Sequence, residues 1–377
     1  MLRLLMFMSL QPLRIIDANI NRASEGVRLL EDVARFILND AGLSQQFKAI
    51  RHDLAEETKL LGLKLLSQRD SGHDVGHPHP IPLPSRERGM DMEASSQQDL
   101  PGVITANAKR VEESLRVIEE LAKLPEITPM LDSGKFEQLR FTLYTSEQRL
   151  TSRILRQDKV KQLAGLYVIL DRPALAGRDE LEIAEQVIQG GAKVIQLRDK
   201  QSNKGELLPV AQKLNALCGK SGILFIINDY LDLALAVGAD GLHIGQRDLP
   251  LPIIRRELPI DKIVGCSATT LPQAIKAQNE GADYIAVGSI FPTTTKKDAT
   301  VVGVSRLKQI RQAVSSPLVA IGGINEDNIG EVMAAGADSV AVISAILGKE
   351  DVKGAVRRLV DFIQGFGSRA QNDGQSR

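Results

Sequence analysis

The sequence predicts an α/β protein in which a mainly helical N-terminal domain precedes a (β/α)8 barrel, the fold known as a TIM barrel. In the second half, eight short apolar runs rich in β-branched residues alternate with helical stretches. In the first half, apolar residues recur at spacings of three and four, and one helical motif occurs twice. The chain of 377 residues is long enough for two domains. We expect a helical domain at 1–157 and a barrel domain at 158–377.

The composition excludes several classes of partner. The 47 basic residues balance 47 acidic ones, which leaves no charge-based case for binding nucleic acid or anionic membranes. No apolar stretch approaches the about 20 residues that span a membrane. The two cysteines, Cys218 and Cys266, lack the spacing of a metal site and suit a reducing compartment. We therefore expect a cytoplasmic protein that binds neither nucleic acid nor membrane.

The N-terminal half begins with an amphipathic helix that recurs 88 residues later, at 17–32 and again at 105–120. Asp17 or Asn19 is in a position to cap the first copy. The repeated charges fit two surface helices with ion pairs along one face, whereas the shared asparagine leaves open a common cap or a duplicated polar site. The identical pairs are Ala18/Ala106, Asn19/Asn107, Arg22/Arg110, Glu25/Glu113, Arg28/Arg116 and Glu31/Glu119.

A proline-rich segment at 77–98 separates the two copies and has no helical or strand periodicity. We expect a disordered surface loop there. His77 and His79 lie in this loop, but no third ligand accompanies them, so we expect no metal site. A further helix is expected over 135–157, leading into the second half.

Eight candidate strands follow, and three of them come directly after a Gly-Ala-Asp step, at 238–240, 281–283 and 336–338. Glycine there is expected to end the preceding helix. Because the strands are apolar at nearly every position, we expect a parallel sheet with both faces buried, closed into a barrel. An open doubly wound sheet is the alternative, but the sequence has no glycine-rich dinucleotide or P-loop motif. The candidate strands are 165–171, 194–199, 223–229, 241–246, 263–268, 284–291, 317–324 and 339–346.

Glycine and polar residues stand at the carboxyl ends of the strands, where barrel enzymes carry their active sites. Gly322 and Gly323 end the seventh strand, and Ile343 and Ser344 lie in the eighth. Backbone N–H groups of such neighbouring segments commonly bind a phosphate. We favour this interpretation over a tight turn that merely requires glycine.

A second anion site is predicted at the ends of the second, third, fourth and sixth strands. Asp229 and Asp248 follow neighbouring strands and could share one Mg²⁺, although isolated loop acids would simply be solvated. Arg198, Lys200 and Lys296 add cations for a highly charged phosphate group. The residues alone therefore predict a Mg²⁺-dependent barrel enzyme with two anion sites.

No protein nucleophile stands out beside these sites. Cys266 lies in a strand just before Ser267, and His243 is expected to be an interior strand residue. A metal and several cations without a nucleophile suit the departure of a pyrophosphate leaving group.

Six short motifs occur in order through the strands: Q-L-R-D-K, I-N-D, H-I-G-Q-x-D, P-T-T-T-K-K-D, A-I-G-G-I and V-I-S. Together they resemble the thiamine-phosphate synthase family over residues 161–365. The resemblance implies that hydroxymethylpyrimidine diphosphate is joined to hydroxyethylthiazole phosphate, giving thiamine phosphate and pyrophosphate. In that family pyrophosphate leaves first, and the thiazole nitrogen then attacks the pyrimidinylmethyl cation.

The same resemblance implies roles for individual residues, with Asp229 and Asp248 as the Mg²⁺ ligands. The pyrimidine diphosphate would contact Gln196, Arg198, Lys200, Asn228, Ser267 and Lys296, and Asp199 is also expected to bind substrate. The thiazole phosphate would contact Thr293, Thr295, Gly323, Ile343 and Ser344, and Thr294 and Gly322 are also expected to bind substrate. The residues expected to act in catalysis are Arg198, Lys200, Ser267 and Lys296.

The N-terminal half resembles a small alternative hydroxymethylpyrimidine-phosphate kinase domain that is fused to this synthase in some bacteria. The resemblance rests on D-A-N-x-N-R-A-x-E-G-x-R, on D-V-G at 74–76 and on T-A-N-x-K-R-V-x-E-S-L-R. The proline-rich insert departs from the pattern directly after D-V-G. A kinase there would use ATP to make the diphosphate that the barrel consumes, so the chain would be bifunctional.

Two other functions stay open. A thiazole tautomerase-like isomerase would use the same barrel, but it would want a histidine near the fifth strand, where Ser267-Ala268-Thr269 stands. A non-catalytic ligand-binding barrel with a helical dimerisation module is the third hypothesis. A homo-oligomer is compatible with each of them.

Overall fold

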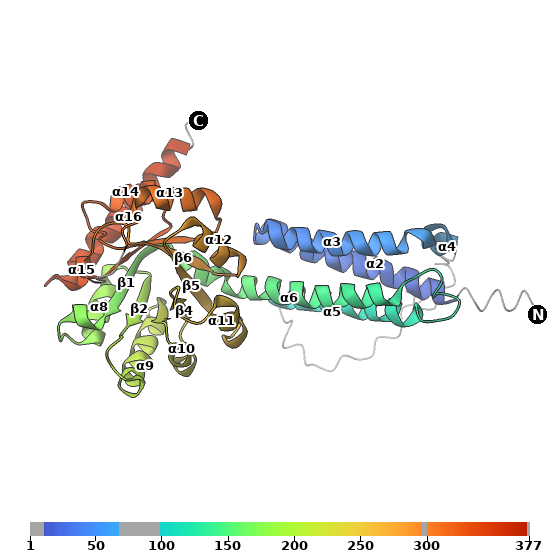
Figure 1. Ribbon diagram of the computed structural model, residues 1–377, viewed down its shortest axis with the longest axis horizontal. Coiled ribbons are helices and arrows are strands. Elements are labelled where there is room, and N and C mark those ends of the chain that lie inside the picture. The colour runs from blue at the N-terminus through green and yellow to red at the C-terminus, as the bar shows by residue number, and fades with distance from the viewer. Residues whose placement is uncertain (1–10, 68–98, 294, 296–299, 375–377) are drawn as a thin grey trace, which may run out of the picture. The chain divides into compact units, whose positions relative to one another are not determined.

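The computed structural model describes residues 11–67, 99–293, 295 and 300–374 (Figure 1). The chain divides into two compact units, Met1–Leu155 and Arg156–Arg377. Each unit has its own hydrophobic core. The predicted loop at 77–98, with His77 and His79, lies outside the described residues.

The described part of the first unit consists of helices. Phe47 and Phe136 are fully buried and anchor its core. Asp40 and Asp99 cap two of the helices, because their carboxylates accept the backbone N–H groups three residues later at 3.0 and 2.9 Å. The elements are α2 (Gln11–Asp32), a π-helical turn (Val33–Ile37), α3 (Ala41–Thr58), a 3-10 turn (Lys59–Leu61), α4 (Gly62–Ser67), α5 (Leu100–Leu121) and α6 (Ser133–Gln162).

The repeated motif occupies α2 and α5, which pack against each other. Gly26 allows this close approach, because a Cβ atom there would lie 2.4 Å from Cγ2 of Val111. Some of the repeated charges lie on the helix surfaces, since Arg22 and Arg110 are both exposed, but the expected surface position is wrong for Glu119, which is buried. Helix pairing in this unit therefore depends on a small residue at the crossing point.

The asparagine shared by the two copies is satisfied inside its own helix. Asn19 and Asn107 each donate a side-chain hydrogen bond of 2.8 Å to the carbonyl four residues earlier. The predicted capping role of Asp17 or Asn19 is wrong, because α2 already includes the residues before them. Helical periodicity shows which face is buried, but it does not show where a long helix begins.

The second unit is a closed barrel of eight parallel strands, in which β8 pairs with β1. The predicted (β/α)8 barrel is therefore confirmed. Its strands are β1 (Gly165–Asp171), β2 (Val194–Arg198), β3 (Leu224–Asn228), β4 (Gly241–Ile244), β5 (Ile263–Ala268), β6 (Tyr284–Val287), β7 (Leu318–Ile321) and β8 (Ser339–Val342). Its helices are α7 (Arg172–Leu175), α8 (Glu180–Gly190), α9 (Lys204–Lys220), α10 (Leu231–Val237), α11 (Leu251–Glu257), α12 (Leu271–Asn279), α13 (Gly303–Ala313), α14 (Ile329–Ala334), α15 (Ser344–Leu347) and α16 (Val352–Gly374). No described helix of either unit is long and apolar enough to cross a membrane.

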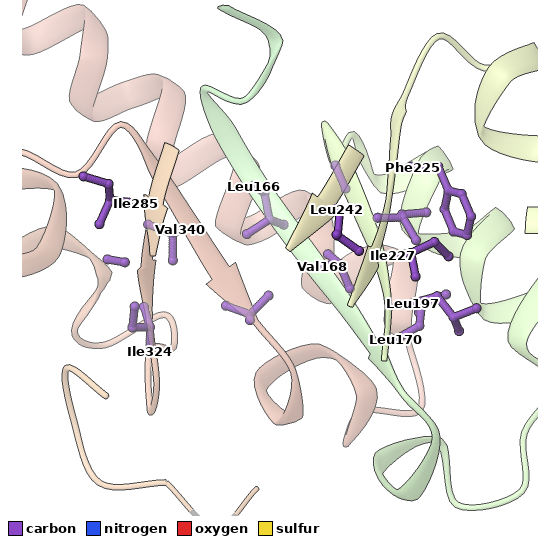
Figure 2. Packing of buried hydrophobic residues seen from close by; sticks show 14 of the residues in the cluster. Leu166, Val168, Leu170, Leu197, Phe225, Ile227, Leu242, Ile285, Ile324 and Val340 are labelled. Carbon is purple, nitrogen blue, oxygen red and sulfur yellow. The ribbon is translucent and has the colours of Figure 1, made fainter. Parts of the chain in front are cut away.

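Both faces of each strand are buried. Leu166, Val168 and Leu170 of β1 belong to the cluster between the strands and the surrounding helices (Figure 2). Tyr167 and Ile169 belong instead to a separate cluster inside the barrel. Successive side chains of a strand point to opposite faces, so this double burial explains why the strand sequences are apolar at nearly every position.

The last turns of α6 form part of the second unit. Arg156 donates from Nε to Oδ1 of Asp283 at 2.8 Å and from Nη1 to the Ile260 carbonyl at 2.7 Å. Leu163, which follows α6, is fully buried in the cluster inside the barrel. The helix expected over 135–157 thus continues to Gln162, because its end is held by contacts with the barrel.

The three Gly-Ala-Asp steps share one local structure, which lies just before the amino ends of three strands. Each glycine has a positive φ, between 68° and 93°, as the end of the preceding helix requires. Each aspartate then accepts a hydrogen bond of 2.8–3.1 Å from a backbone N–H near the start of the preceding strand. The bonds are Phe225 N–H to Asp240, Val264 N–H to Asp283 and Leu318 N–H to Asp338.

The eighth strand is shorter than the sequence predicts. It ends at Val342, so Ile343 and Ser344 follow the strand rather than lying in it. Ser344 begins α15, a single turn in which Ile346 and Leu347 are buried. The apolar run covers both the strand and the helical turn after it. Its hydrophobicity therefore does not show where the strand ends.

Candidate active site

Two carboxylates meet at the carboxyl ends of β3 and β4. Asn228 is the last residue of β3, and Asp229 follows it with a φ of 64°, a conformation that is uncommon outside glycine. The backbone N–H of Asp229 donates to the carbonyl of His243 at 2.8 Å, which ties this turn to β4. Asp248 lies in the loop after β4, where it accepts the Gly245 N–H at 2.7 Å.

The carboxyl groups of Asp229 and Asp248 lie close enough for each to affect the ionisation of the other. Burial raises the pKa of Asp248 and the contact with Asp229 raises it further, whereas the N–H of Gly245 acts in the opposite direction. Nζ of Lys200 lies 2.8 Å from Oδ2 of Asp229. Two facing acids fit a divalent cation, since Mg²⁺ is commonly held by one or two carboxylates with phosphate oxygens and water. Within the described residues, no cluster of three His, Cys, Asp or Glu could hold a metal by itself.

Arg198 ends β2 beside this pair. Its guanidinium forms an ion pair with Asp171 at the end of β1, and Asp171 is buried. An arginine held by a buried carboxylate has a defined position. Arg198 therefore lies at the same end of the barrel as Lys200 and Asp229.

Asp199 is engaged within its own loop. Its Oδ1 accepts the backbone N–H groups of Gln201 and Ser202 at 2.8 and 3.0 Å, and its Oδ2 accepts from Arg172 at 3.1 Å. Burial acts to raise the pKa of Asp199, but these hydrogen bonds lower it to about 2. This carboxylate holds the loop after β2, and its predicted contact with a substrate stays a prediction.

A chain of hydrogen bonds crosses the barrel interior and joins two predicted substrate contacts, Gln196 and Ser267. Nε2 of Gln196 donates to the hydroxyl of Tyr167 at 2.9 Å, and this hydroxyl lies 3.0 Å from that of Tyr284. The Tyr284 hydroxyl lies 3.1 Å from Nδ1 of His243, whose Nε2 lies 2.9 Å from Oγ of Ser267. Burial lowers the pKa of His243 to about 4 and raises the pKa of both tyrosines.

The glycines after β7 lie where the predicted thiazole phosphate would bind. Gly322 and Gly323 have φ of 102° and 65°, which favours glycine at both positions. A Cβ atom on Gly323 would also lie 2.4 Å from the carbonyl oxygen of Pro292 in the loop after β6. Ile343 and Ser344 follow the neighbouring strand, β8. These backbone segments thus come together at one side of the barrel mouth.

The threonine segment after β6 is described only in part. Oγ1 of Thr293 accepts the N–H of Thr295 at 3.3 Å. Thr294 and Lys296 lie outside the described residues, so the structure places neither of them.

Sequence reasoning missed the residues that support the predicted contacts from within the barrel. Tyr167, Tyr284 and Asp171 lie in apolar strand runs, where such residues usually serve the core. One local signal is Gly265 in the middle of β5, because a Cβ atom there would lie 2.0 Å from Cζ of Tyr284. A glycine inside a strand marks a place where another group approaches the backbone closely.

Comparison with known proteins decides the family. A family model described as thiamine monophosphate synthase matches residues 166–346. The thiamine-phosphate synthase of Thermosynechococcus vestitus is 40% identical over 349 residues, which cover 92% of this chain and 93% of that protein. The chain belongs to the thiamine-phosphate synthase family.

Other relatives of this synthase are shorter. The thiamine-phosphate synthase of Clostridium tetani is 49% identical over 197 residues, which cover 52% of this chain and 94% of that protein. A solved structure of thiamine phosphate pyrophosphorylase from Pyrococcus furiosus is 38% identical, with a TM-score of 0.52, and is covered over 98% of its length. A second family model, described as the ThiD2 family, matches residues 14–149 and so falls on the helical unit. The synthase is thus a transferase of thiamine biosynthesis that carries an additional N-terminal region.

Proposed function

We propose that the synthase joins hydroxymethylpyrimidine diphosphate to hydroxyethylthiazole phosphate at the carboxyl ends of the barrel strands. The products would be thiamine phosphate and pyrophosphate. The observation that carries this proposal is the meeting of Asp229, Asp248 and Lys200, which sets two metal-binding carboxylates beside a cation for a diphosphate. Membership of the family supports the same reaction.

The two substrates would occupy two anion sites at this end of the barrel. Arg198 and Lys200 would bind the diphosphate together with Asn228 and Lys296, with Asp199 in the adjoining loop. Gln196 and Ser267 would bind the pyrimidine ring. The thiazole phosphate would bind to backbone and hydroxyl groups of Thr293, Thr294, Thr295, Gly322, Gly323, Ile343 and Ser344.

Asp229 and Asp248 would hold Mg²⁺. Their proximity and the raised pKa of Asp248 support this, because two neighbouring acids favour a cation between them. When bound, the cation would neutralise negative charge on the diphosphate oxygens. Lys200 would add positive charge for the diphosphate, since its ammonium group lies 2.8 Å from Oδ2 of Asp229.

The reaction itself would need no protein nucleophile. The bond between the pyrimidinylmethyl carbon and the diphosphate oxygen breaks first, and its electron pair leaves with the oxygen. The thiazole nitrogen then donates its lone pair to that carbon. Arg198 and Lys200 stabilise the charge that develops on the leaving group. Cys266 does not compete as a nucleophile, because burial raises the pKa of its thiol to about 12.

The direct test is formation of thiamine phosphate by the purified chain with Mg²⁺ and both substrates. We expect product that disappears when the metal is chelated and returns when Mg²⁺ is restored. An unmodified, folded chain that releases no pyrophosphate under these conditions would refute the proposal.

We further propose that the helical unit phosphorylates hydroxymethylpyrimidine phosphate. The ThiD2 match over residues 14–149 supports this activity. The γ-phosphoryl group of ATP would pass to the phosphate of the substrate, releasing ADP and the diphosphate that the barrel uses. In the test, pyrimidine monophosphate and ATP replace the diphosphate in the synthase assay. Thiamine phosphate in this tube supports a bifunctional enzyme, whereas product only from the diphosphate leaves a structural or dimerisation role for the unit.

We also propose that the enzyme acts in the cytoplasm and forms a homo-oligomer. The absence of a membrane-spanning helix from the described residues is compatible with the first point. Cell fractionation tests the location. Light scattering on the purified chain tests the oligomeric state, and a monomer at working concentration would contradict the second point.

A further inference from the structure

The hydrogen-bond chain inside the barrel is held in place by burial and packing. Gln196 is 2% exposed and Tyr284 is fully buried, so neither exchanges its partner for bulk water. The ring of Tyr284 crosses the barrel only because position 265 is glycine. The imidazole of His243 stacks on this ring, with centroids 5.6 Å apart and an interplanar angle of 25°. Packing against Gly265 and His243 thus holds Tyr284, which lies in the middle of the hydrogen-bond chain.

The hydrogen-bond chain also has a direction, because each tyrosine hydroxyl carries one proton. Nε2 of Gln196 donates to Tyr167, which leaves the proton of Tyr167 for the oxygen of Tyr284. The proton of Tyr284 is then left for Nδ1 of His243. A neutral imidazole has a single N–H, which must therefore be on Nε2 and donate to Oγ of Ser267.

The two ends of the chain present complementary groups to a ligand. Oγ of Ser267 already accepts from His243 and has no other hydrogen bond among the described residues, so its own proton is left for a ligand. Oε1 of Gln196 likewise has no partner in the part of the chain that the structure describes, and it can only accept. An aminopyrimidine offers the matching pair, an amino group that donates and a ring nitrogen that accepts.

We propose that Tyr167, Tyr284 and His243 are positioning residues that make Ser267 a hydrogen-bond donor toward a ring nitrogen of the pyrimidine. This inference rests on the proposed function, because it takes Ser267 as a contact of the pyrimidine substrate. It adds the polarity of that contact and the residues that set it. A Gln196 amide turned by 180° would reverse every bond and make Ser267 an acceptor, so the tautomer of His243 reports which polarity is present.

The first test measures that tautomer without any substrate. ¹⁵N NMR of the histidine side chains in the full chain should show His243 with its proton on Nε2. The variant His243→Gln identifies its signals among the five histidines of the sequence. Tyr284→Phe keeps the ring on Gly265 but removes the proton donated to Nδ1, so the tautomer with a proton on Nδ1 should appear. That tautomer in the unmodified protein would overturn the inference, whether or not the chain makes thiamine phosphate.

The second test asks whether Tyr284 acts through Ser267. Tyr284→Phe should lower kcat/KM for the pyrimidine diphosphate by about three- to tenfold, the usual worth of one hydrogen bond, and leave KM for the thiazole phosphate unchanged. In a Ser267→Ala background the same change should have less than about a 1.5-fold effect, because the group it positions is gone. Tyr144→Phe in the helical unit is the matched control and should change neither constant.

Each kinetic outcome either supports or overturns the role of Tyr284 as a positioning residue. An equal loss from Tyr284→Phe in both backgrounds means that Tyr284 only supports the barrel fold, and it would overturn the inference. Non-additive losses confined to the pyrimidine substrate support it. If the unmodified protein makes no product, the proposed function fails. The NMR experiment alone then decides the polarity of the hydrogen-bond chain.

Discussion

The barrel unit and the helical unit use their buried polar groups in different ways. In the barrel, Gln196, Tyr167, Tyr284 and His243 form one chain of hydrogen bonds that ends at the carboxyl ends of the strands. In the helical unit, buried polar side chains such as Asn19, Thr58 and Ser146 bond within their own helix, and Glu119 joins two helices. Glu119 is 3% exposed and accepts from Arg140 of α6 at 3.2 Å. The barrel thus connects buried polar groups of several strands, whereas those of the helical unit stay within one helix or join two neighbouring helices.

One pair in the helical unit departs from this pattern. Glu112 on α5 lies close to Glu147 on α6, and Oε1 of Glu112 is buried without a hydrogen-bond partner. Burial, followed by the charge of Glu147, raises the pKa of Glu112 to about 7. The pair therefore retains a proton at pH values where ordinary glutamates have lost theirs. Both units thus contain a carboxyl pair, but only the barrel places its pair beside a lysine at the strand ends.

The largest expected effect is on the stability of the barrel. Arg156→Met removes a guanidinium that is nearly fully buried against Asp283 and leaves that carboxylate with one arginine fewer. We expect a loss of about 3 kcal/mol, seen by calorimetry as a lower transition temperature of the barrel. Lys161→Met, which removes an exposed pair with Asp158, is the control and should change stability by less than about 0.5 kcal/mol. An unchanged barrel transition in Arg156→Met would show that α6 does not stabilise this unit.

The next effect is on catalysis in the barrel alone. Asp229→Asn keeps the size of the side chain and suits the left-handed backbone, but it removes a proposed metal ligand. We expect pyrophosphate release to fall about a hundredfold or more with no change in melting temperature. Asp232→Asn, in an exposed pair with Lys204, is the matched control. Full activity in Asp229→Asn would remove the metal assignment.

A smaller effect is expected on the contact between the repeated helices. Gly26→Ala places a methyl group against Val111 and forces α2 and α5 apart. The cost of overpacking exceeds the gain in helix propensity, so we expect a net loss of about 1–2 kcal/mol in the helical unit. Gly62→Ala, with nothing within 4 Å of the new atom, is the control. Synthase activity should be unchanged in both variants, and a loss of it in Gly26→Ala alone would link the helix contact to the barrel reaction.

The smallest effect is a pH dependence confined to the helical unit. The folded state holds a proton on Glu112 up to about pH 7, whereas the unfolded state releases it near the ordinary value of 4.5. Stability from this group is therefore fully present below pH 4.5 and is lost as the pH rises through 7. Because solvent screens a pair that is only partly buried, we expect a change of about 1 kcal/mol. The measurement is urea unfolding of the unit between pH 5 and 8.

Glu112→Gln should abolish this pH dependence, because glutamine carries no titrating proton. Glu113→Gln removes an exposed neighbour and is the matched control. An equal pH dependence in the wild-type chain and in Glu112→Gln would mean that the carboxyl pair does not titrate as described.

Much of the barrel is predictable from local patterns. The order and number of strands follow from apolar runs, and the Gly-Ala-Asp steps mark where helices end, since both features arise from neighbouring residues. Local patterns do not predict an element boundary where one apolar run continues from a strand into the following helix. Ile343 continues the apolar run of β8 but lies outside the strand, because the turn that follows also buries apolar residues, Ile346 and Leu347. The start of α2 is missed for a related reason, since Asn19 looks like a cap but bonds within its helix.

The sequence by itself determined the fold class and the residues at the strand ends, because strand, turn and loop signals are local. Only the tertiary structure decided which of those residues meet. Asp229 and Asp248 are joined because β3 and β4 are neighbours in a closed barrel, while Asp199 is withdrawn into its own loop. Tyr167 and Tyr284 lie 117 residues apart and come within 3.0 Å across the barrel interior. Barrel closure sets contacts of that kind, so no local pattern in the sequence can show them.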